Sequence, residues 1–334
     1  MSKPTGIAVI GLGTALFPHA QSLNELTELC VVRHAVARQA EAAQQAAGRW
    51  GWPAGTDLDA ALADPDVEAV LLLTPANTHA DLALRCFAAG KHVLCEKPLD
   101  ARLDQAEAMV AAADRAGRQL GTMLQCRFRP ASLRLQAALR GGELGVVQAA
   151  HLSVPWWRPQ SYYDMPGRGT RAQDGGGVLM TQAIHMLDLF RALVGVEQVL
   201  AADIRTTALH RMECEDYATA LLRLSGGAIG TLSATTAAYP GRPEAMEIIG
   251  TLGCARMLGG GLALDFLDGR QEVMADTAGS GSGANVMAFS HEPHKALIAD
   301  FLTAIRSGGR PAVTGREALA SQRLIQAIID AAGS

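Results

Sequence analysis

Short, almost wholly apolar runs alternate with helical stretches over the first 124 residues, and this alternation restricts the fold more than any other feature. Strands that are apolar on both faces and separated by helices are typical of a parallel sheet covered on both sides. The sequence therefore predicts an α/β domain with a doubly wound parallel sheet. The expected strands are 5–10, 30–37, 69–73, 92–95 and 119–124. One expected helix follows the first strand and ends near residue 28, and the others span 39–49, 80–89 and 103–116.

The pattern changes near residue 125, where longer strand-like runs joined by glycine-containing turns replace the alternation. Such runs indicate a mostly antiparallel sheet. We therefore predict two domains, a first over 1–125 and an α+β second over 126–334 with a large open-faced sheet, whose last helices could pack back on the first. The expected strands are 146–154, 199–209, 217–224, 228–237 and 245–252, the expected helices are 178–193, 293–306 and 316–331, and a mobile Gly/Ser-rich loop is expected at 278–284.

Composition narrows the class of protein. Hydrophobic residues make up 49% of the 334 and charged residues 19%, with a net charge of −4, so a packed globular protein is expected. No basic stripe is present, which excludes nucleic acid and anionic membrane as expected partners. The six cysteines form no C-x-x-C pair and are expected to be buried thiols. No export segment and no apolar span of about 20 residues is found, so the expected location is the cytoplasm.

A glycine turn after the first strand predicts a cofactor site. Gly11 and Gly13 follow the run 5–10 directly and, with Thr14, lead into a helical stretch. Glycines there let the backbone approach a pyrophosphate, and the helix N-terminus offers free N–H groups to it. The third glycine of the Rossmann fingerprint is missing, because Leu16 stands in its place.

The end of the second strand bears on the choice of nicotinamide cofactor. An NAD site usually carries Asp or Glu there, which binds the ribose 2′-hydroxyl. This chain instead has Arg38, whose planar guanidinium can pair with a 2′-phosphate. The sequence predicts NADP, with NAD as the alternative. A solvated surface arginine is the other interpretation of Arg38.

Two separated groups of motifs carry a family resemblance. The first is Thr74-Pro75 with His79, then Gly90-Lys91-His92-Val93 and Glu96-Lys97-Pro98, and the second is Gly175-Gly176-Gly177-Val178-Leu179 followed by Ile184-His185 and Asp188. On these motifs the chain resembles the Gfo/Idh/MocA family (glucose-fructose oxidoreductase, inositol dehydrogenase, rhizopine catabolism). The resemblance implies an NAD(P)-dependent oxidoreductase that moves a hydride between the nicotinamide and a secondary alcohol carbon of a sugar, sugar acid, nucleotide sugar or polyol. It also implies a cis Lys97–Pro98 bond and cofactor contacts from Thr74, Pro75, His79, Glu96, Lys97 and Arg127.

The residues themselves support a catalytic pair. Lys97 follows a strand at the carboxyl edge of the parallel sheet, where ligands bind in open α/β sheets, and can stabilise an alkoxide-like oxygen or transfer a proton. His185 is the expected partner, because imidazole titrates near neutral pH. A surface lysine in a turn and a core histidine bonded to backbone are the alternative interpretations.

Aromatic and polar residues in the second half suit a polyhydroxylated substrate. The expected contacts are Trp157, Arg158, Tyr163, Arg168, Thr181 and Gln182. Many family members carry Asp where this chain has Thr181, and often tryptophan at the positions of Gly167 and Arg171, so the pocket is expected to be altered. A domain-interface loop is the other interpretation of residues 156–170.

Two alternatives to a sugar dehydrogenase remain open. One is a non-catalytic NAD(P)-binding sensor on the same fold, and the other is a family enzyme that uses tightly bound cofactor for transient oxidation. The open sheet face is expected to form a homodimer or homotetramer. No metal site is predicted, because Pro293 interrupts the segment His291-Glu292-Pro293-His294, which is expected to start a helix.

Overall fold

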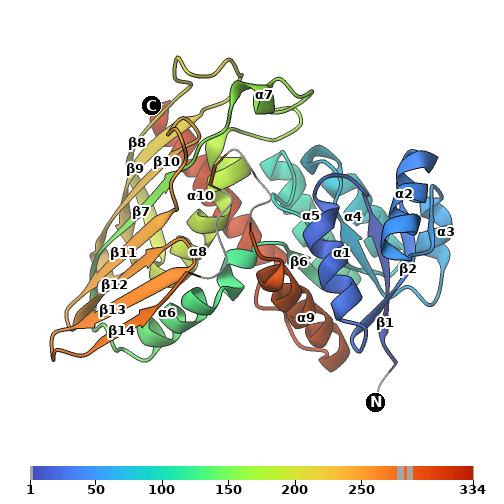
Figure 1. The fold of residues 1–334 in the computed structure, drawn as a ribbon, viewed down its shortest axis with the longest axis horizontal. Coiled ribbons are helices and arrows are strands. Elements are labelled where there is room, and N and C mark those ends of the chain that lie inside the picture. The colour runs from blue at the N-terminus through green and yellow to red at the C-terminus, as the bar shows by residue number, and fades with distance from the viewer. Residues whose placement is uncertain (1–2, 277–281, 284–288, 334) are drawn as a thin grey trace. The chain divides into compact units, whose positions relative to one another are not determined.

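The computed structural model describes residues 3–276, 282–283 and 289–333, and the chain divides into two compact units (Figure 1). The first unit comprises residues 1–125 together with 291–320, and the second comprises 126–290 together with 321–334. Residues 291–320 of the predicted second domain thus cluster with the first unit. The predicted Gly/Ser-rich loop at 278–284 lies outside the described residues except for Ser282 and Gly283.

The first unit is built on the predicted parallel sheet. Its strand order is β3-β2-β1-β4-β5-β6, and every neighbouring pair is parallel. This is the strand order of the doubly wound dinucleotide-binding fold, in which ligands bind where the order reverses. The strands are β1 (Thr5–Ile10), β2 (Cys30–Val36), β3 (Ala54–Gly55), β4 (Ala69–Leu72), β5 (His92–Cys95) and β6 (Leu120–Thr122), and the helices are α1 (Leu16–Glu25), α2 (Ala40–Trp50), α3 (Leu58–Ala63), α4 (His79–Ala88), α5 (Leu103–Ala116) and α9 (Glu292–Ser307).

Local sequence explains where these elements begin and end. Strands β1 and β4 are buried at every position, as expected for the centre of a sheet covered on both faces. Helices α2 and α5 end at Gly51 and Gly117, which adopt the left-handed conformation that glycine tolerates best. Helix α9 begins at the proline-containing segment and packs against β6, where a Cβ on Gly121 would lie 2.8 Å from the Phe301 ring.

The second unit contains an eight-stranded sheet in the order β14-β13-β12-β11-β7-β10-β9-β8. All neighbouring pairs are antiparallel except β10 and β7, so the prediction of a mostly antiparallel sheet is confirmed. Buried and less buried residues alternate along β9, which is typical of a sheet with one covered face. The strands are β7 (Val147–Pro155), β8 (Val196–Arg205), β9 (Tyr217–Leu224), β10 (Ile229–Thr235), β11 (Ala245–Gly250), β12 (Gly253–Leu258), β13 (Gly261–Phe266) and β14 (Gln271–Met274).

Several elements of the second unit were absent from the sequence prediction. Helices α6 (Pro130–Arg140) and α7 (Gln160–Tyr163) precede the predicted helical region, and strands β12 to β14 extend the sheet beyond β11. The expected helix 178–193 is a π-helical turn (Leu179–Ala183) followed by α8 (Ile184–Val194). The last helix is α10 (Gly315–Ala332).

Within the residues described, no helix combines the length and the apolar character needed to cross a membrane. All six cysteines lie in this part of the chain and none forms a disulfide. Five of them are buried, as the sequence predicted.

A buried ion pair joins Arg129, just before α6, to Glu244, just before β11. Arg129 Nη1 donates to Glu244 Oε1 at 2.6 Å, and the Trp156 indole N–H donates to the other oxygen at 3.2 Å. The Glu244 side chain is fully buried. A buried carboxylate is tolerated only when it is paired and hydrogen-bonded, so the loss of Arg129 would leave an uncompensated charge.

We predict that Arg129→Met lowers the free energy of unfolding of the second unit by about 3 kcal/mol, because the Glu244 carboxylate loses its charged partner. Denaturant unfolding measures the change. The control is Arg102→Met, which breaks an exposed pair with Asp104 and should cost less than about 1 kcal/mol. Equal losses in the two variants would contradict the assigned role of the buried pair.

Candidate active site

The carboxyl edge of the first unit's sheet brings three predicted segments to adjacent positions. The Leu73 N–H donates to the Ile10 carbonyl at 2.8 Å, and the Glu96 N–H donates to the Leu72 carbonyl at 2.9 Å. These bonds extend the parallel ladder past the ends of β1, β4 and β5. The turn after β1, the loop after β4 and the segment carrying Lys97 therefore leave the sheet side by side.

The two glycines of the turn after β1 differ in their surroundings: Gly11 is tightly packed against backbone, and Gly13 borders open space. Gly11 has a φ of 98°, and a Cβ there would lie 2.7 to 2.8 Å from backbone atoms of Leu73 and Thr74. A Cβ on Gly13 would meet nothing within 4 Å. Gly13 and Thr14 are exposed just before α1. This open backbone ahead of a helix is suited to a pyrophosphate.

His79 joins the loop after β4 to the loop after β5. Its ring is buried, with Nε2 2.8 Å from the Thr74 carbonyl and Nδ1 2.9 Å from the Pro98 carbonyl. Both ring nitrogens thus face backbone oxygens. The side chain predicted to contact the cofactor fixes the relative position of two loops.

Lys97 lies partly buried immediately after β5, and its bond to Pro98 is cis, as the resemblance implied. Its backbone N–H donates to Glu96 Oε2 at 3.0 Å. Arg38 lies exposed directly after β2, at the same edge of the sheet.

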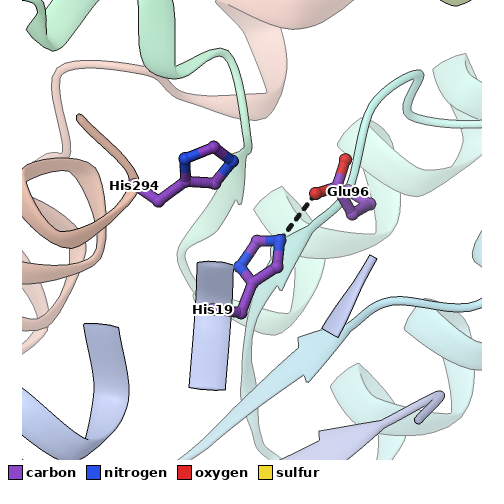
Figure 2. A group of neighbouring side chains, drawn as sticks. All are labelled: His19, Glu96 and His294. Carbon is purple, nitrogen blue, oxygen red and sulfur yellow. Dashed lines mark hydrogen bonds and ion pairs between the residues drawn. The ribbon is translucent and has the colours of Figure 1, made fainter. Parts of the chain in front are cut away.

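Glu96 belongs to a cluster that the sequence analysis did not predict (Figure 2). His19 on α1 places Nε2 2.7 Å from Glu96 Oε1, and the His294 ring on α9 meets the His19 ring edge-on at a centroid distance of 5.2 Å. Burial alone would raise the pKa of Glu96. The hydrogen bond from His19, the positive charge of His19 and that of Lys97 outweigh it and hold that pKa well below its usual range. Glu96 is therefore a carboxylate anion at neutral pH.

The same three side chains are one of two groups in the described residues whose ligand atoms lie within 4.8 Å of one another. A zinc ion with bonds of about 2.0–2.2 Å would need ligand atoms only about 3.4 Å apart. Within this group, the hydrogen bond of 2.7 Å brings the His19 and Glu96 ligand atoms closer together than that spacing.

In the second unit, Glu215 shapes the glycine-rich turn before the predicted histidine. Its carboxylate accepts the N–H groups of Gly177 and Leu179, both at 3.1 Å, and its carbonyl accepts the Val178 N–H at 2.8 Å. A Cβ on Gly177 would lie 1.8 Å from that carbonyl oxygen, so the turn needs glycine there. Burial raises the pKa of Glu215. The residue satisfies the free N–H groups at this helix start, although no motif in the sequence marked it.

The helical segment after this turn differs from the prediction. Thr181 lies in the π-helical turn and His185 in the first turn of α8, so the four-residue spacing of a regular α-helix does not apply between them. Both residues are partly buried. The Thr181 hydroxyl donates to the Gly177 carbonyl at 2.6 Å, which fixes its orientation toward the start of the turn. π-helical turns occur frequently at functional sites.

Arg127 anchors α8 within the second unit. Its Nε and Nη2 donate to the two oxygens of Asp188, at 2.6 and 2.7 Å, and the Ser321 hydroxyl donates to the same carboxylate at 2.6 Å. The Asp188 side chain is fully buried. Two residues predicted from the resemblance thus bind each other and fix the helix that carries His185.

The predicted substrate contacts in the aromatic segment fall into two groups, one buried in internal contacts and one partly buried. Arg158 is 4% exposed, and its Nη1 donates to the carbonyls of Trp157 and Gly283 at 2.8 and 2.7 Å. Tyr163 is 7% exposed, and its hydroxyl lies 2.6 Å from Thr236 Oγ1. Both side chains are engaged inside the second unit, which favours a structural role for them.

Tyr162 is less buried than the predicted substrate contact Tyr163, and it lies beside two other predicted substrate contacts. Gln182 Nε2 donates to its hydroxyl at 3.4 Å, and the Arg168 guanidinium lies 5.3 Å from its ring centroid. Tyr162, Arg168 and Trp157 are all partly buried. Tyr162 and Gln182 are 20 residues apart in sequence, so no local pattern could pair them.

Comparison with known proteins decides the family. A model of the Gfo/Idh/MocA family, described as an oxidoreductase family with an NAD-binding Rossmann fold, matches residues 5–123, and the C-terminal domain model of the family matches residues 132–256. The chain belongs to the Gfo/Idh/MocA family. It is therefore an oxidoreductase whose first domain is an NAD-binding Rossmann fold, as the motifs around Lys97 and His185 implied.

Relatives within this family cover nearly the whole chain. Myo-inositol 2-dehydrogenase of Thermotoga maritima is 26% identical over 93% of this chain and 91% of its own length. 1,5-anhydro-D-fructose reductase of Ensifer adhaerens is 29% identical over 84% and 81%. The WlbA dehydrogenase of Bordetella pertussis, solved with NADH and UDP-GlcNAcA, superposes with a TM-score of 0.84 at 27% identity over 99% of this chain and 97% of that one.

We predict that Gly11→Ala destabilises the first unit by at least about 1–2 kcal/mol, because alanine is strained at this φ and its methyl group meets the backbone after β4. Thermal unfolding measures the loss. Gly13→Ala is the matched control, and its melting temperature should stay near that of the unmodified chain because the space around Gly13 is open. A Gly11→Ala protein as stable as this control would refute the proposed packing.

Proposed function

We propose that this Gfo/Idh/MocA protein transfers a hydride between a nicotinamide cofactor and a secondary alcohol carbon of a sugar, sugar acid, nucleotide sugar or polyol. The observation that carries the proposal is the position of Lys97, which follows β5 at the sheet edge where the glycine turn after β1 and the loop after β4 also end. The named activities of relatives, which act on inositol and anhydrofructose, support this substrate class.

In the proposed reaction, the cofactor carries the hydride and side chains of the protein handle the proton. Bound nicotinamide accepts or donates the hydride. Oxidation of an alcohol also releases one proton, and we assign its removal to the neutral side chain of either Lys97 or His185, with the other group assisting the transfer. The Lys97 ammonium would stabilise the developing negative charge on the substrate oxygen. His79 and Glu215 would hold the two segments that present these groups.

Most of the proposed substrate contacts come from partly buried residues of the second unit. Trp157, Tyr162 and Arg168 offer ring faces and a cation, and Thr181 offers a hydroxyl. Gln182 is 4% exposed and is included for its amide, which donates to the Tyr162 hydroxyl. Such a set suits a ring with several hydroxyls. A structural relative solved with UDP-GlcNAcA supports nucleotide sugars as one class to test. A sensor without activity has no need of Lys97 and His185, so turnover separates the two hypotheses.

We also propose a homodimer or homotetramer formed through the eight-stranded sheet. Leu221 on β9 and Ile229 on β10 lie on the same face of that sheet and are 40% and 51% exposed. An apolar face of this kind is typical of an interface.

We predict that Arg38→Asp shifts the cofactor preference from NADP toward NAD, by about tenfold or more in the ratio of kcat/KM values, because the guanidinium that pairs with a 2′-phosphate is replaced by a carboxylate that repels it. Steady-state kinetics with both cofactors measures the ratio. A strong preference of the unmodified chain for NAD would show that Arg38 does not read the phosphate.

We predict that Lys97→Ala lowers kcat by about 10²–10⁴-fold while the dissociation constant of the cofactor changes little, because the lysine acts on the substrate hydroxyl. Turnover is measured with a panel of polyols, aldoses, uronates and UDP-sugars, and cofactor binding by calorimetry. Lys3→Ala, which removes an exposed lysine, is the control. Normal turnover by the Lys97→Ala protein would remove the lysine from the mechanism, and no turnover of any panel member by the unmodified chain would reject the proposed activity.

A further inference from the structure

Glu96 uses its two carboxylate oxygens to connect two segments that the proposed reaction needs. Oε1 pairs with His19 Nε2 at 2.7 Å (Figure 2). Oε2 accepts the Lys97 backbone N–H at 3.0 Å. His19 lies on α1, the helix that begins directly after the glycine turn. One carboxylate thus ties the helix behind the dinucleotide turn to the segment that carries Lys97.

We propose that Glu96, held in place by His19, is a positioning residue that orients the Lys97 segment and sets the charge state of the Lys97 side chain. The proposal deepens the proposed function, because it rests on Lys97 taking part in proton transfer. It gives Glu96 a task other than contact with the cofactor.

His19 lies in position to donate a hydrogen bond to the Glu96 carboxylate. The His19 side chain is fully buried, and a proton on Nε2 is donated to Glu96. In the part of the chain that the structure describes, Nδ1 of His19 has no hydrogen-bond partner. His19 thus orients Glu96 as a hydrogen-bond donor.

The charge of Glu96 acts on Lys97 through a partly buried environment. His19 on α1 contacts the carboxylate directly, and the charges of Lys97 and of His294 on α9 also lower the pKa of Glu96. The Glu96 side chain is 16% exposed, so water screens this attraction less than it would at the surface. Removal of the negative charge should make the Lys97 ammonium less stable and lower the pH at which it loses its proton.

The test is the pH dependence of acylation of Lys97 by acetic anhydride, followed by mass spectrometry of the peptide that carries it. Only the neutral amine reacts, so the midpoint of the labelling curve reports the ionisation of Lys97. Glu96→Gln keeps the size of the side chain and removes its charge. We expect its midpoint to move to lower pH by at least about half a unit. An unmoved midpoint would overturn the proposal.

A matched control is available in the same unit. His34 Nε2 lies 2.8 Å from Asp64 Oδ2, so His34→Gln also breaks a histidine–carboxylate contact, but one remote in sequence from Lys97. It should leave the Lys97 midpoint unchanged. Glu96→Asp keeps the charge on a shorter side chain, and its midpoint should stay closer to that of the unmodified chain than the Glu96→Gln midpoint does. A midpoint that moves equally in all three variants would mean that general loosening, and not charge, is responsible.

Kinetics supplies a second readout. Glu96→Gln should lower kcat while the KM for the cofactor stays within about threefold, and the rise of oxidation rate with pH should move to lower pH in parallel with the labelling midpoint. Equal losses in kcat, cofactor affinity and melting temperature would indicate a purely structural role and reject the proposal.

A substitute variant covers the case in which Glu96→Gln does not fold, and labelling separates the role of Glu96 from the proposed function. If Glu96→Gln does not fold, the double variant Glu96→Gln with His19→Gln replaces it, because two facing amides can satisfy each other's hydrogen bonds. Labelling requires no turnover. Absence of activity in the unmodified chain would therefore reject the proposed function, while an unmoved labelling midpoint would reject the role of Glu96.

Discussion

The parallel hydrogen-bond ladder of the first unit is the constraint on which the candidate active site depends. Because all six strands run in one direction, each of them ends at the same edge of the sheet. The ladder continues past the last strand residues through Leu73 and Glu96. Segments that lie far apart in sequence, at Gly11, Thr74 and Lys97, thereby become neighbours. The parallel pairing of the strands is enough to bring these three segments together.

Carboxylates that are wholly or largely removed from water provide the next level of organisation, and each one ties together segments remote in sequence. Glu96 joins α1 to the Lys97 segment, Asp188 joins α8 to Arg127 and α10, Glu215 holds the turn before the π-helical segment, and Glu244 holds the start of α6. A carboxylate removed from water must be hydrogen-bonded or paired, so these positions tolerate few alternatives. In this chain, the hydrogen bonds of Glu96 and Asp188 fix the segments that carry Lys97 and His185.

Sequence patterns predicted most of the first unit because its signals are local. The bounds of β1, β5 and α5 agree with the predicted ranges, since apolar strands and a helix ended by Gly117 carry their own limits. The second unit was harder. Strands β12 to β14 mix glycine and charged residues with apolar ones, and α6 carries no acidic residue in its first turn. The contact between Glu215 and the start of the π-helical turn could not be predicted, because the Leu179 N–H donates to a carboxylate 36 residues away in sequence.

The sequence by itself predicted the two-part architecture, the glycine turn at Gly11, the family, and the choice of a lysine and a histidine as candidate catalytic groups, because the patterns and motifs behind each of these lie along the chain itself. Tertiary structure alone decided which side chains remain available. It buried Arg158 and Tyr163 in internal contacts, committed His79 to backbone carbonyls and brought His19 to Glu96 across 77 positions. The physical reason is that a hydrogen bond between distant residues depends on where the chain returns in space, and no local pattern records that return.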